Sequence, residues 1–136
     1  MPTVDRTHIE LDLLPGLFAV VQLEPGSPLP AWAHSNTLFS LTTTETETSV
    51  LCDDISAPDG IRAERGFRCF RVRGPLDFAL VGILQRLIEP LATAGISVFV
   101  ISTFDTDYIL VPGASLEAAV AALTGAGHAV RRDGAA

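Results

Sequence analysis

The stretch that decides the fold is Gly95-Ile96-Ser97-Val98-Phe99-Val100-Ile101-Ser102-Thr103-Phe104-Asp105-Thr106-Asp107-Tyr108-Ile109-Leu110-Val111. Two apolar runs rich in β-branched residues flank a short polar segment, Ser102 to Asp107. This pattern is typical of two strands joined by a tight turn that carries hydroxyl and carboxylate groups. The stretch therefore predicts a β-hairpin whose turn concentrates polar groups where a small ligand could bind.

The residues on either side of this hairpin complete an order of elements. An alternating strand pattern covers Phe67 to Val72, and apolar positions with helical spacing follow from Phe78 to Ala94, closed by Gly95. Ser115 is a candidate cap for a short helix that ends at the glycines 125 and 127, and His128 to Arg131 reads as a last strand. The second half of the chain therefore predicts the order βαββαβ.

The first half has strand patterns but no long helical one. Strands are expected at His8 to Leu13 and Leu17 to Leu23, and a hairpin at Leu38 to Thr42 with Ser49 to Cys52. The order of elements in this half resembles that of the second half with its helices reduced, although no sequence repeat proves the relationship. We therefore expect a degenerate module at residues 1–64, a complete module at 65–132 and a tail at 133–136.

Composition excludes several classes of function. The net charge of −7 argues against nucleic acid or an anionic membrane as a partner, because both need a basic face. All nine basic residues are arginine, which excludes Schiff-base and other lysine chemistry. We find no signal-peptide pattern and no apolar run long enough to span a bilayer, so we expect a cytoplasmic protein. Cys52 and Cys69 are expected to be buried free thiols.

The search for a catalytic centre finds no pattern. His8, His34 and His128 are isolated in the sequence, with no spacing typical of a metal site or of a nucleophile–base pair. Asp105 and Asp107 do not by themselves indicate general acid–base chemistry. The sequence therefore predicts a protein that is not an enzyme and that uses no metal or cofactor.

The βαββαβ order, the Gly-Pro-Leu-Asp turn at 74–77 and the segments 94–97 and 101–111 together resemble the ACT domain family. The likeness is greatest to small ACT proteins with two modules, the first degenerate, which are related to aspartokinase regulatory domains and to the animal cytosolic arginine sensor. The resemblance implies an α+β, ferredoxin-like fold with an antiparallel sheet and helices on one face. It also implies regulation by a small ligand, usually an amino acid, and association into dimers.

The first candidate ligand site is the turn that carries Gly74, Leu76 and Asp77. Free backbone N–H groups at the start of the long helix suit a ligand carboxylate, and Gly74 allows close approach of the backbone. Asp77 reads either as the helix cap or as a partner for a ligand amine, and both roles are compatible.

The second candidate site is the hairpin turn, where Ser102, Thr103, Asp105 and Thr106 could hold an ammonium group beside the backbone of Val98 and Phe99. The alternative is a turn that satisfies only its own backbone. In ACT domains the ligand commonly lies between these two regions of neighbouring modules, so the resemblance implies that both candidates serve one pocket.

These observations lead to one hypothesis and one alternative. The hypothesis is a non-enzymatic regulatory protein that binds an amino acid and forms a homodimer. The alternative is an interaction module that docks a partner through a sheet edge or a helix face without a small ligand. Polar turns that satisfy only their own backbones would favour the alternative.

Overall fold

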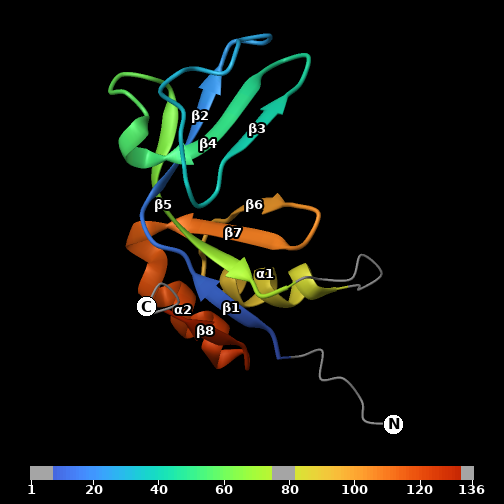
Figure 1. Cartoon of the computed structure of the whole chain (residues 1–136). Helices are drawn as coiled ribbons and strands as arrows, with labels where there is room; N and C mark the ends of the chain where they lie inside the picture. The colour runs from blue at the N-terminus through green and yellow to red at the C-terminus, as the bar shows by residue number, and fades with distance from the viewer. Residues whose placement is uncertain (1–7, 75–81, 133–136) are drawn as a thin grey trace. The chain divides into compact units, whose positions relative to one another are not determined.

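The computed structural model describes residues 8–74 and 82–132 (Figure 1). The described strands are β1 (Glu10–Leu13), β2 (Phe18–Leu23), β3 (Ser40–Thr43), β4 (Thr48–Asp53), β5 (Ala63–Val72), β6 (Phe99–Ser102), β7 (Asp107–Pro112) and β8 (Ala129–Arg131). The described helices are α1 (Ile83–Thr93) and α2 (Leu116–Gly125), with short 3₁₀ turns η1 (Asp54–Ser56) and η2 (Gly113–Ser115). None of these helices is long and apolar enough to cross a membrane.

Two compact units make up the chain. One contains residues Pro15–Arg68, and the other combines Met1–Leu14 with Cys69–Ala136. Strand β5 passes from the first of these units into the second. The units are therefore not two consecutive segments, because the N-terminal strand β1 packs with the C-terminal unit. That the first 64 residues derive from a degenerate module remains a prediction.

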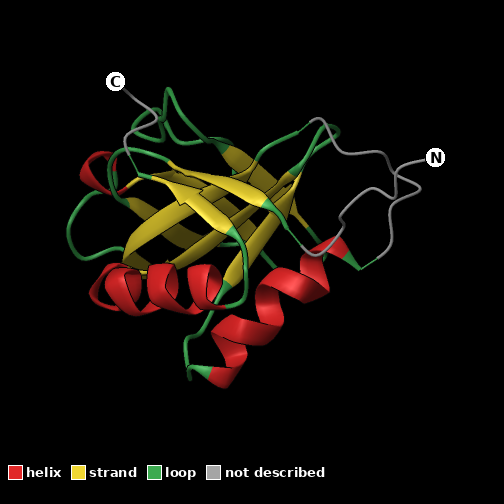
Figure 2. Cartoon of the chain, turned by 90° about the horizontal axis from the view of Figure 1, so that it is seen from below, coloured by secondary structure: helices red, strands yellow, loops and turns green. Residues whose placement is uncertain are grey.

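The C-terminal unit has the predicted order βαββαβ, from β5 to β8, and the mixed α+β fold is confirmed. Its strands follow the order β8-β1-β5-β7-β6. Strand β1 lies between the first and last strands of the βαββαβ unit. It runs antiparallel to β5, with Asp12 opposite Arg71, and parallel to β8, with Asp12 opposite Arg131. Figure 2 shows α1 and α2 on the same side of the strands.

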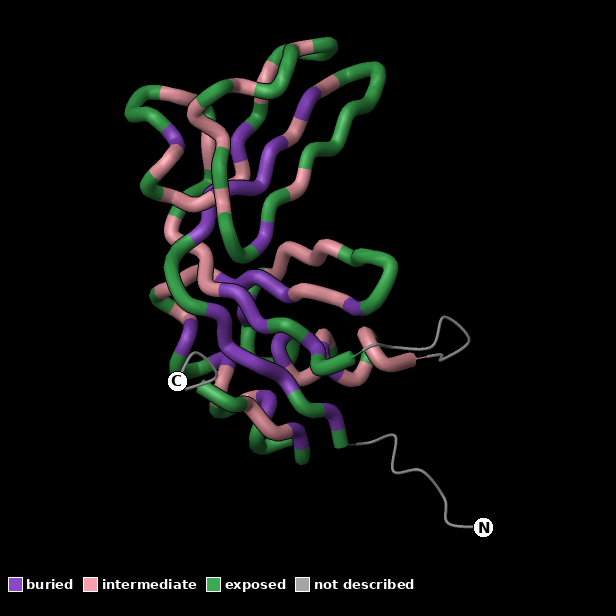
Figure 3. Tube along the Cα trace, viewed as in Figure 1, coloured by how far each residue is buried: buried purple, intermediate pink, exposed green. Residues whose placement is uncertain are grey.

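The core of this unit lies between the sheet and the two helices. Leu11 and Leu13 of β1 point into it, as do Leu87 and Leu91 of α1, which are four residues apart and so share one helix face. The remaining fully buried side chains of this core are Phe70, Val72, Ile109, Val111, Ala119 and Leu123. Figure 3 shows buried positions along the central strands of this unit. Because strand side chains alternate, Glu10 and Asp12 lie on the opposite face of the sheet.

The other unit is an antiparallel sheet in the order β3-β4-β2-β5. The predicted hairpin is confirmed at β3 and β4, where Ser40 pairs with Leu51 and Thr43 with Thr48. Its small core comprises Ala19, Val21, Val50, Cys52 and Ala57. Within the described part of this unit the only helical element is the turn η1. Cys52 and Cys69 are both buried and free, as predicted.

Candidate functional site

The turn between β6 and β7 satisfies most of its own polar groups. The Ser102 hydroxyl donates to the Asp107 carboxylate across 2.5 Å. The backbone N–H and the hydroxyl of Thr103 both donate to the Thr106 carbonyl oxygen, at 2.8 and 3.1 Å. The Thr106 N–H in turn donates to the Thr103 hydroxyl oxygen at 3.3 Å. Asp105 differs, since its carboxylate is exposed and forms no ion pair with the described residues.

A buried hydroxyl joins this turn to the end of β5. The Thr106 side chain is 8% exposed, and its hydroxyl donates to the Val72 carbonyl oxygen across 2.7 Å. Val72 is the last residue of β5 and lies two positions before Gly74. The bond therefore places the hairpin turn and Gly74 at the same end of the sheet, so the structure brings together parts of the two sequence-predicted candidate sites.

The other sequence-predicted residues have different positions. Leu76 and Asp77 lie outside the described residues, so their part in the candidate site remains a prediction. Val98 packs against the core, which leaves only its backbone for a ligand. Phe99 is half-buried at the start of β6, opposite Leu110. Gly74 is exposed.

Replacing Thr106 by valine removes the hydroxyl that anchors the turn and leaves the Val72 carbonyl oxygen without this donor. We expect the free energy of unfolding to fall by about 1–2 kcal/mol, the usual effect of losing a buried hydrogen bond. Urea denaturation measures the loss. Thr42→Val, at an exposed position on β3, is the control and should change little. If both substitutions changed the free energy of unfolding equally, the Thr106 hydroxyl would have no structural role.

A carboxylate with three arginine partners lies on the sheet face away from the helices. The Asp12 side chain is 5% exposed, and its Oδ1 accepts from Arg73 and Arg131, each at 2.9 Å. Its Oδ2 accepts from Arg71 at 3.3 Å. The hydrogen bond from Arg73 is the main cause that lowers the pKa of Asp12, assisted by Arg71 and Arg131 and opposed by burial. Arg73 also pairs with Glu10 at 2.9 Å.

Sequence reasoning missed this ion-pair cluster. The alternation along residues 8–13 indicated that Glu10 and Asp12 lie on one face of their strand, and Arg71 fell within the strand expected at Phe67 to Val72. It gave no sign that the two strands are neighbours. The cluster joins β1 to both β5 and β8, and so holds the inserted strand in the sheet.

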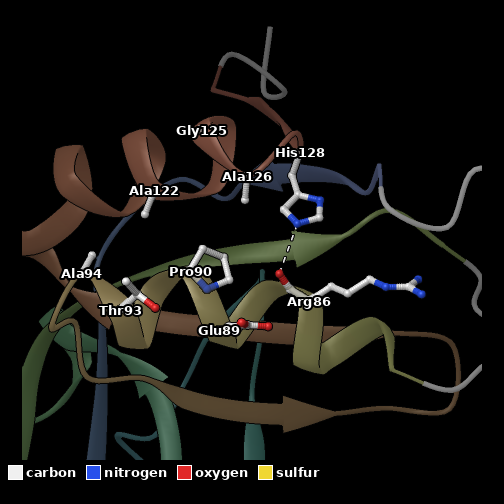
Figure 4. Close-up of a pocket in the computed structure, with 9 residues that line it drawn as sticks. All are labelled: Arg86, Glu89, Pro90, Thr93, Ala94, Ala122, Gly125, Ala126 and His128. Carbon is white, nitrogen blue, oxygen red and sulfur yellow. Dashed lines mark hydrogen bonds between the residues drawn. The ribbon is translucent and has the colours of Figure 1, made fainter.

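An open groove of about 610 Å³ runs between α1 and α2 (Figure 4). Its lining residues are Arg86, Glu89, Pro90, Thr93, Ala94, Ala122, Gly125, Ala126 and His128. His128 is 6% exposed. Its Nδ1 lies 3.1 Å from the Ile9 N–H donor and its Nε2 lies 3.1 Å from the Arg86 carbonyl oxygen. These partners require an acceptor at Nδ1 and a donor at Nε2, which defines the neutral Nε2–H tautomer.

The groove and His128 gave no signal in the sequence. Both hydrogen-bond partners of the imidazole are backbone groups, so no side-chain motif in the sequence reveals them. The groove has no recognisable motif either, because its walls are mostly alanine, glycine and proline.

The described residues show no candidate metal centre. They contain no cluster of three histidine, cysteine, aspartate or glutamate side chains that could hold a metal ion. Burial raises the pKa of the Cys69 thiol to about 12, so this group stays protonated at neutral pH and is a poor nucleophile.

The βαββαβ order, the antiparallel pairing and the helices on one face define a ferredoxin-like domain. A sequence model of the ACT domain matches residues 62–125, and a model of an N-terminal domain matches residues 16–59. A crystal structure of a protein from Agobacterium tumefaciens is 37% identical to this chain, covers 90% of it and 92% of its own length, and superposes with a TM-score of 0.85. The chain belongs to the ACT domain family.

Two more distant structures share the fold. A Vibrio cholerae protein, described as of unknown function and as a possible transport protein, is 16% identical over 89% of this chain and 91% of its own, with a TM-score of 0.71. The regulatory subunit of aspartate kinase from Thermus thermophilus is 11% identical over 86% of this chain and 94% of its own, with a TM-score of 0.57. No curated protein matches the chain.

Proposed function

We propose that this chain is a non-enzymatic, cytoplasmic regulatory protein that binds an amino acid and acts as a homodimer. The observation that carries the proposal is the anchored turn, since Thr106 holds Asp105 and Gly74 at one end of an ACT sheet. Membership of the ACT family and the likeness to a regulatory subunit support the regulatory role.

Two groups at this end of the sheet suit the two charges of an amino acid. The exposed carboxylate of Asp105 offers a partner for an ammonium group. The backbone near Gly74, with the predicted contributions of Leu76 and Asp77, offers N–H donors for a carboxylate. Ser102, Thr103 and Thr106 would act by holding the turn, because their hydroxyls already have partners.

The internal hydrogen bonds of the turn favour a second candidate function, an interaction module without a small ligand. Strand β6 supports this alternative. Among the described strands it pairs only with β7, and its residues Phe99, Val100 and Ile101 are half-buried. An apolar edge strand of this kind can pair with a strand of another chain.

A thermal-shift screen against the twenty amino acids at millimolar concentration separates the two functions. A ligand that binds only the folded state raises the melting temperature, and at about 100 times its dissociation constant it adds about 2.7 kcal/mol of stability. We expect a selective rise with one chemical group of amino acids. A flat response from folded protein would favour the interaction module.

Asp105→Ala tests the location of the ligand. The variant should bind the amino acid found in the screen about tenfold more weakly, because a hydrogen bond to a charged group is lost. Its melting temperature without ligand should not change, since Asp105 is exposed. Calorimetric titration measures the affinity, and Asp59→Ala, at an exposed position in the other unit, is the control. If the Asp105→Ala variant bound the amino acid with unchanged affinity, Asp105 would not be part of the ligand site.

A further inference from the structure

The arginine patch, formed by Arg71, Arg73 and Arg131 around Asp12, lies on the sheet face away from the helices (Figure 2). Asp12 of β1 is directly opposite Arg71 of β5 and Arg131 of β8, so these three residues form one row across neighbouring strands. Because neighbouring strands are about 4.8 Å apart, the Cα atoms of the two flanking arginines are about 10 Å apart. Arg73, which follows β5, reaches the same carboxylate at 2.9 Å. Asp12 therefore draws three guanidinium groups together.

The two arginines that flank Asp12 keep N–H donors for a further acceptor. A guanidinium has five N–H donors. Arg71 uses Nη2 and Arg131 uses Nε to bond Asp12, and among the described residues neither side chain bonds to another acceptor. Their side chains are 44% and 56% exposed, whereas that of Asp12 is 5% exposed. The carboxylate thus lies beneath guanidinium groups whose remaining donors are accessible to solvent.

The arginine patch carries excess positive charge in an acidic chain. Its three arginines meet two carboxylates, since Arg73 pairs with Glu10 as well as with Asp12. Because Arg73 contacts both carboxylates, the excess positive charge lies with Arg71 and Arg131. The net charge of −7 on the whole chain repels a long polyanion, whereas a small anion contacts only the patch.

We propose that Arg71 and Arg131, positioned by Asp12, bind the phosphate group of a small molecule. Arginine suits this group because its planar, permanently charged guanidinium donates charge-assisted hydrogen bonds to phosphate oxygens. A tetrahedral phosphate presents oxygens in several directions and can accept from both arginines at once. Asp12 already orders the two side chains, which lowers the entropic cost of binding. This ligand class differs from that of the proposed function, and the inference stands without it.

Inorganic phosphate is the first probe of the site. We expect it to shift the NMR signals of the Arg71 and Arg131 Nε–H groups in a saturable way when it is titrated into the intact chain at constant ionic strength. Acetate should bind at least tenfold more weakly, because a planar carboxylate accepts from one guanidinium at a time. Equal affinities for acetate and phosphate would overturn the assignment to phosphate.

Methyl phosphate distinguishes the two sources of a phosphate group. An affinity at least equal to that of inorganic phosphate would support a phosphorylated small molecule as the ligand. An affinity more than tenfold lower would overturn that ligand class, and the site would then take the free ion.

Substitutions test the location of the site. Arg71→Gln and Arg131→Gln should each weaken phosphate binding about tenfold, because each removes hydrogen bonds to a charged group. Either variant leaves Asp12 with two arginine partners and should fold, which circular dichroism checks. Arg132→Gln is the matched control, since Arg132 is the next residue but donates both its Nη groups to Glu117, at 2.8 and 2.6 Å. If Arg132→Gln weakened binding as much as Arg131→Gln, net charge and not the arginine patch would hold the anion.

The outcomes separate this inference from the proposed function. If the chain bound phosphate but none of the twenty amino acids, the proposed function would fall and the phosphate site would remain. If neither inorganic phosphate nor methyl phosphate gave a saturable shift, the phosphate site would be overturned, and amino-acid binding would be unaffected.

Discussion

The Asp12→Ala variant is expected to unfold at a lower urea concentration than the wild-type chain, with a loss of about 2 kcal/mol in the free energy of unfolding. Asp12 is the shared acceptor of Arg71, Arg73 and Arg131. Without it three guanidinium groups are left close together, and among the described residues Glu10 is the one carboxylate that still pairs with them. The half-exposed arginines can turn toward water, which keeps the loss below that of a fully buried ion pair.

The same carboxylate makes stability depend on pH in a defined direction. Arg73 and its neighbours lower the pKa of Asp12 in the folded state below the usual value of 3.8. The carboxylate therefore stabilises the fold at every pH above the pKa of the unfolded chain, and the contribution is lost as pH falls through the folded pKa. The difference in stability between the wild type and Asp12→Ala should be constant near neutral pH and shrink below about pH 4.

Glu10→Ala is the matched control for Asp12→Ala. Glu10 is on the same strand and pairs with Arg73, but its side chain is 49% exposed, so its loss should change stability little. Urea denaturation at pH 7 and at pH 3 gives the full comparison. If Asp12→Ala were no less stable than Glu10→Ala at pH 7, the cluster would not hold β1 in the sheet.

The existence of strand β1 could be predicted from the sequence, but its neighbours in the sheet could not. Alternation along residues 8–13 indicated a half-buried strand, because periodicity depends only on which face each side chain takes. A strand is present at Glu10–Leu13, but Asp12 on its polar face is buried as well. The partners of this strand are about 60 and 119 residues away, at β5 and β8. No local pattern encodes such pairings, so the sequence could not place β1 between them.

The helices and the hairpin were predicted with small differences at their ends. Residues 78–81 of the helix predicted from Phe78 to Ala94 lie outside the described residues. The helix α1 begins at Ile83 and continues through Pro90 to Thr93 as one helix. Strand β6 begins at Phe99. Ile96 lies just beyond α1, where its N–H donates to the Leu91 carbonyl oxygen at the end of the helix. The turn of the hairpin was predicted as polar, and its internal hydrogen bonds are one of the two alternatives that the sequence left open.

The second large effect is expected for His128→Leu, which should lower the free energy of unfolding by about 3 kcal/mol. Leucine fills much of the volume of the buried ring, but it leaves the Ile9 N–H and the Arg86 carbonyl oxygen without their partners. Each unsatisfied buried group costs about 1–3 kcal/mol. Because Ile9 immediately precedes β1, its amide should also exchange with solvent faster than in the wild type, which NMR hydrogen exchange measures.

His34→Leu is the control for this substitution, since His34 is exposed and belongs to the other unit. It should change neither the stability nor the exchange of the Ile9 amide. An unstable His128→Leu variant whose Ile9 amide stays protected would mean that the loss comes from packing and not from the hydrogen bonds. Faster exchange of the Ile9 amide would instead show that the His128 hydrogen bonds stabilise the start of β1. One imidazole would then hold both the first turns of α1 and the residue that precedes β1.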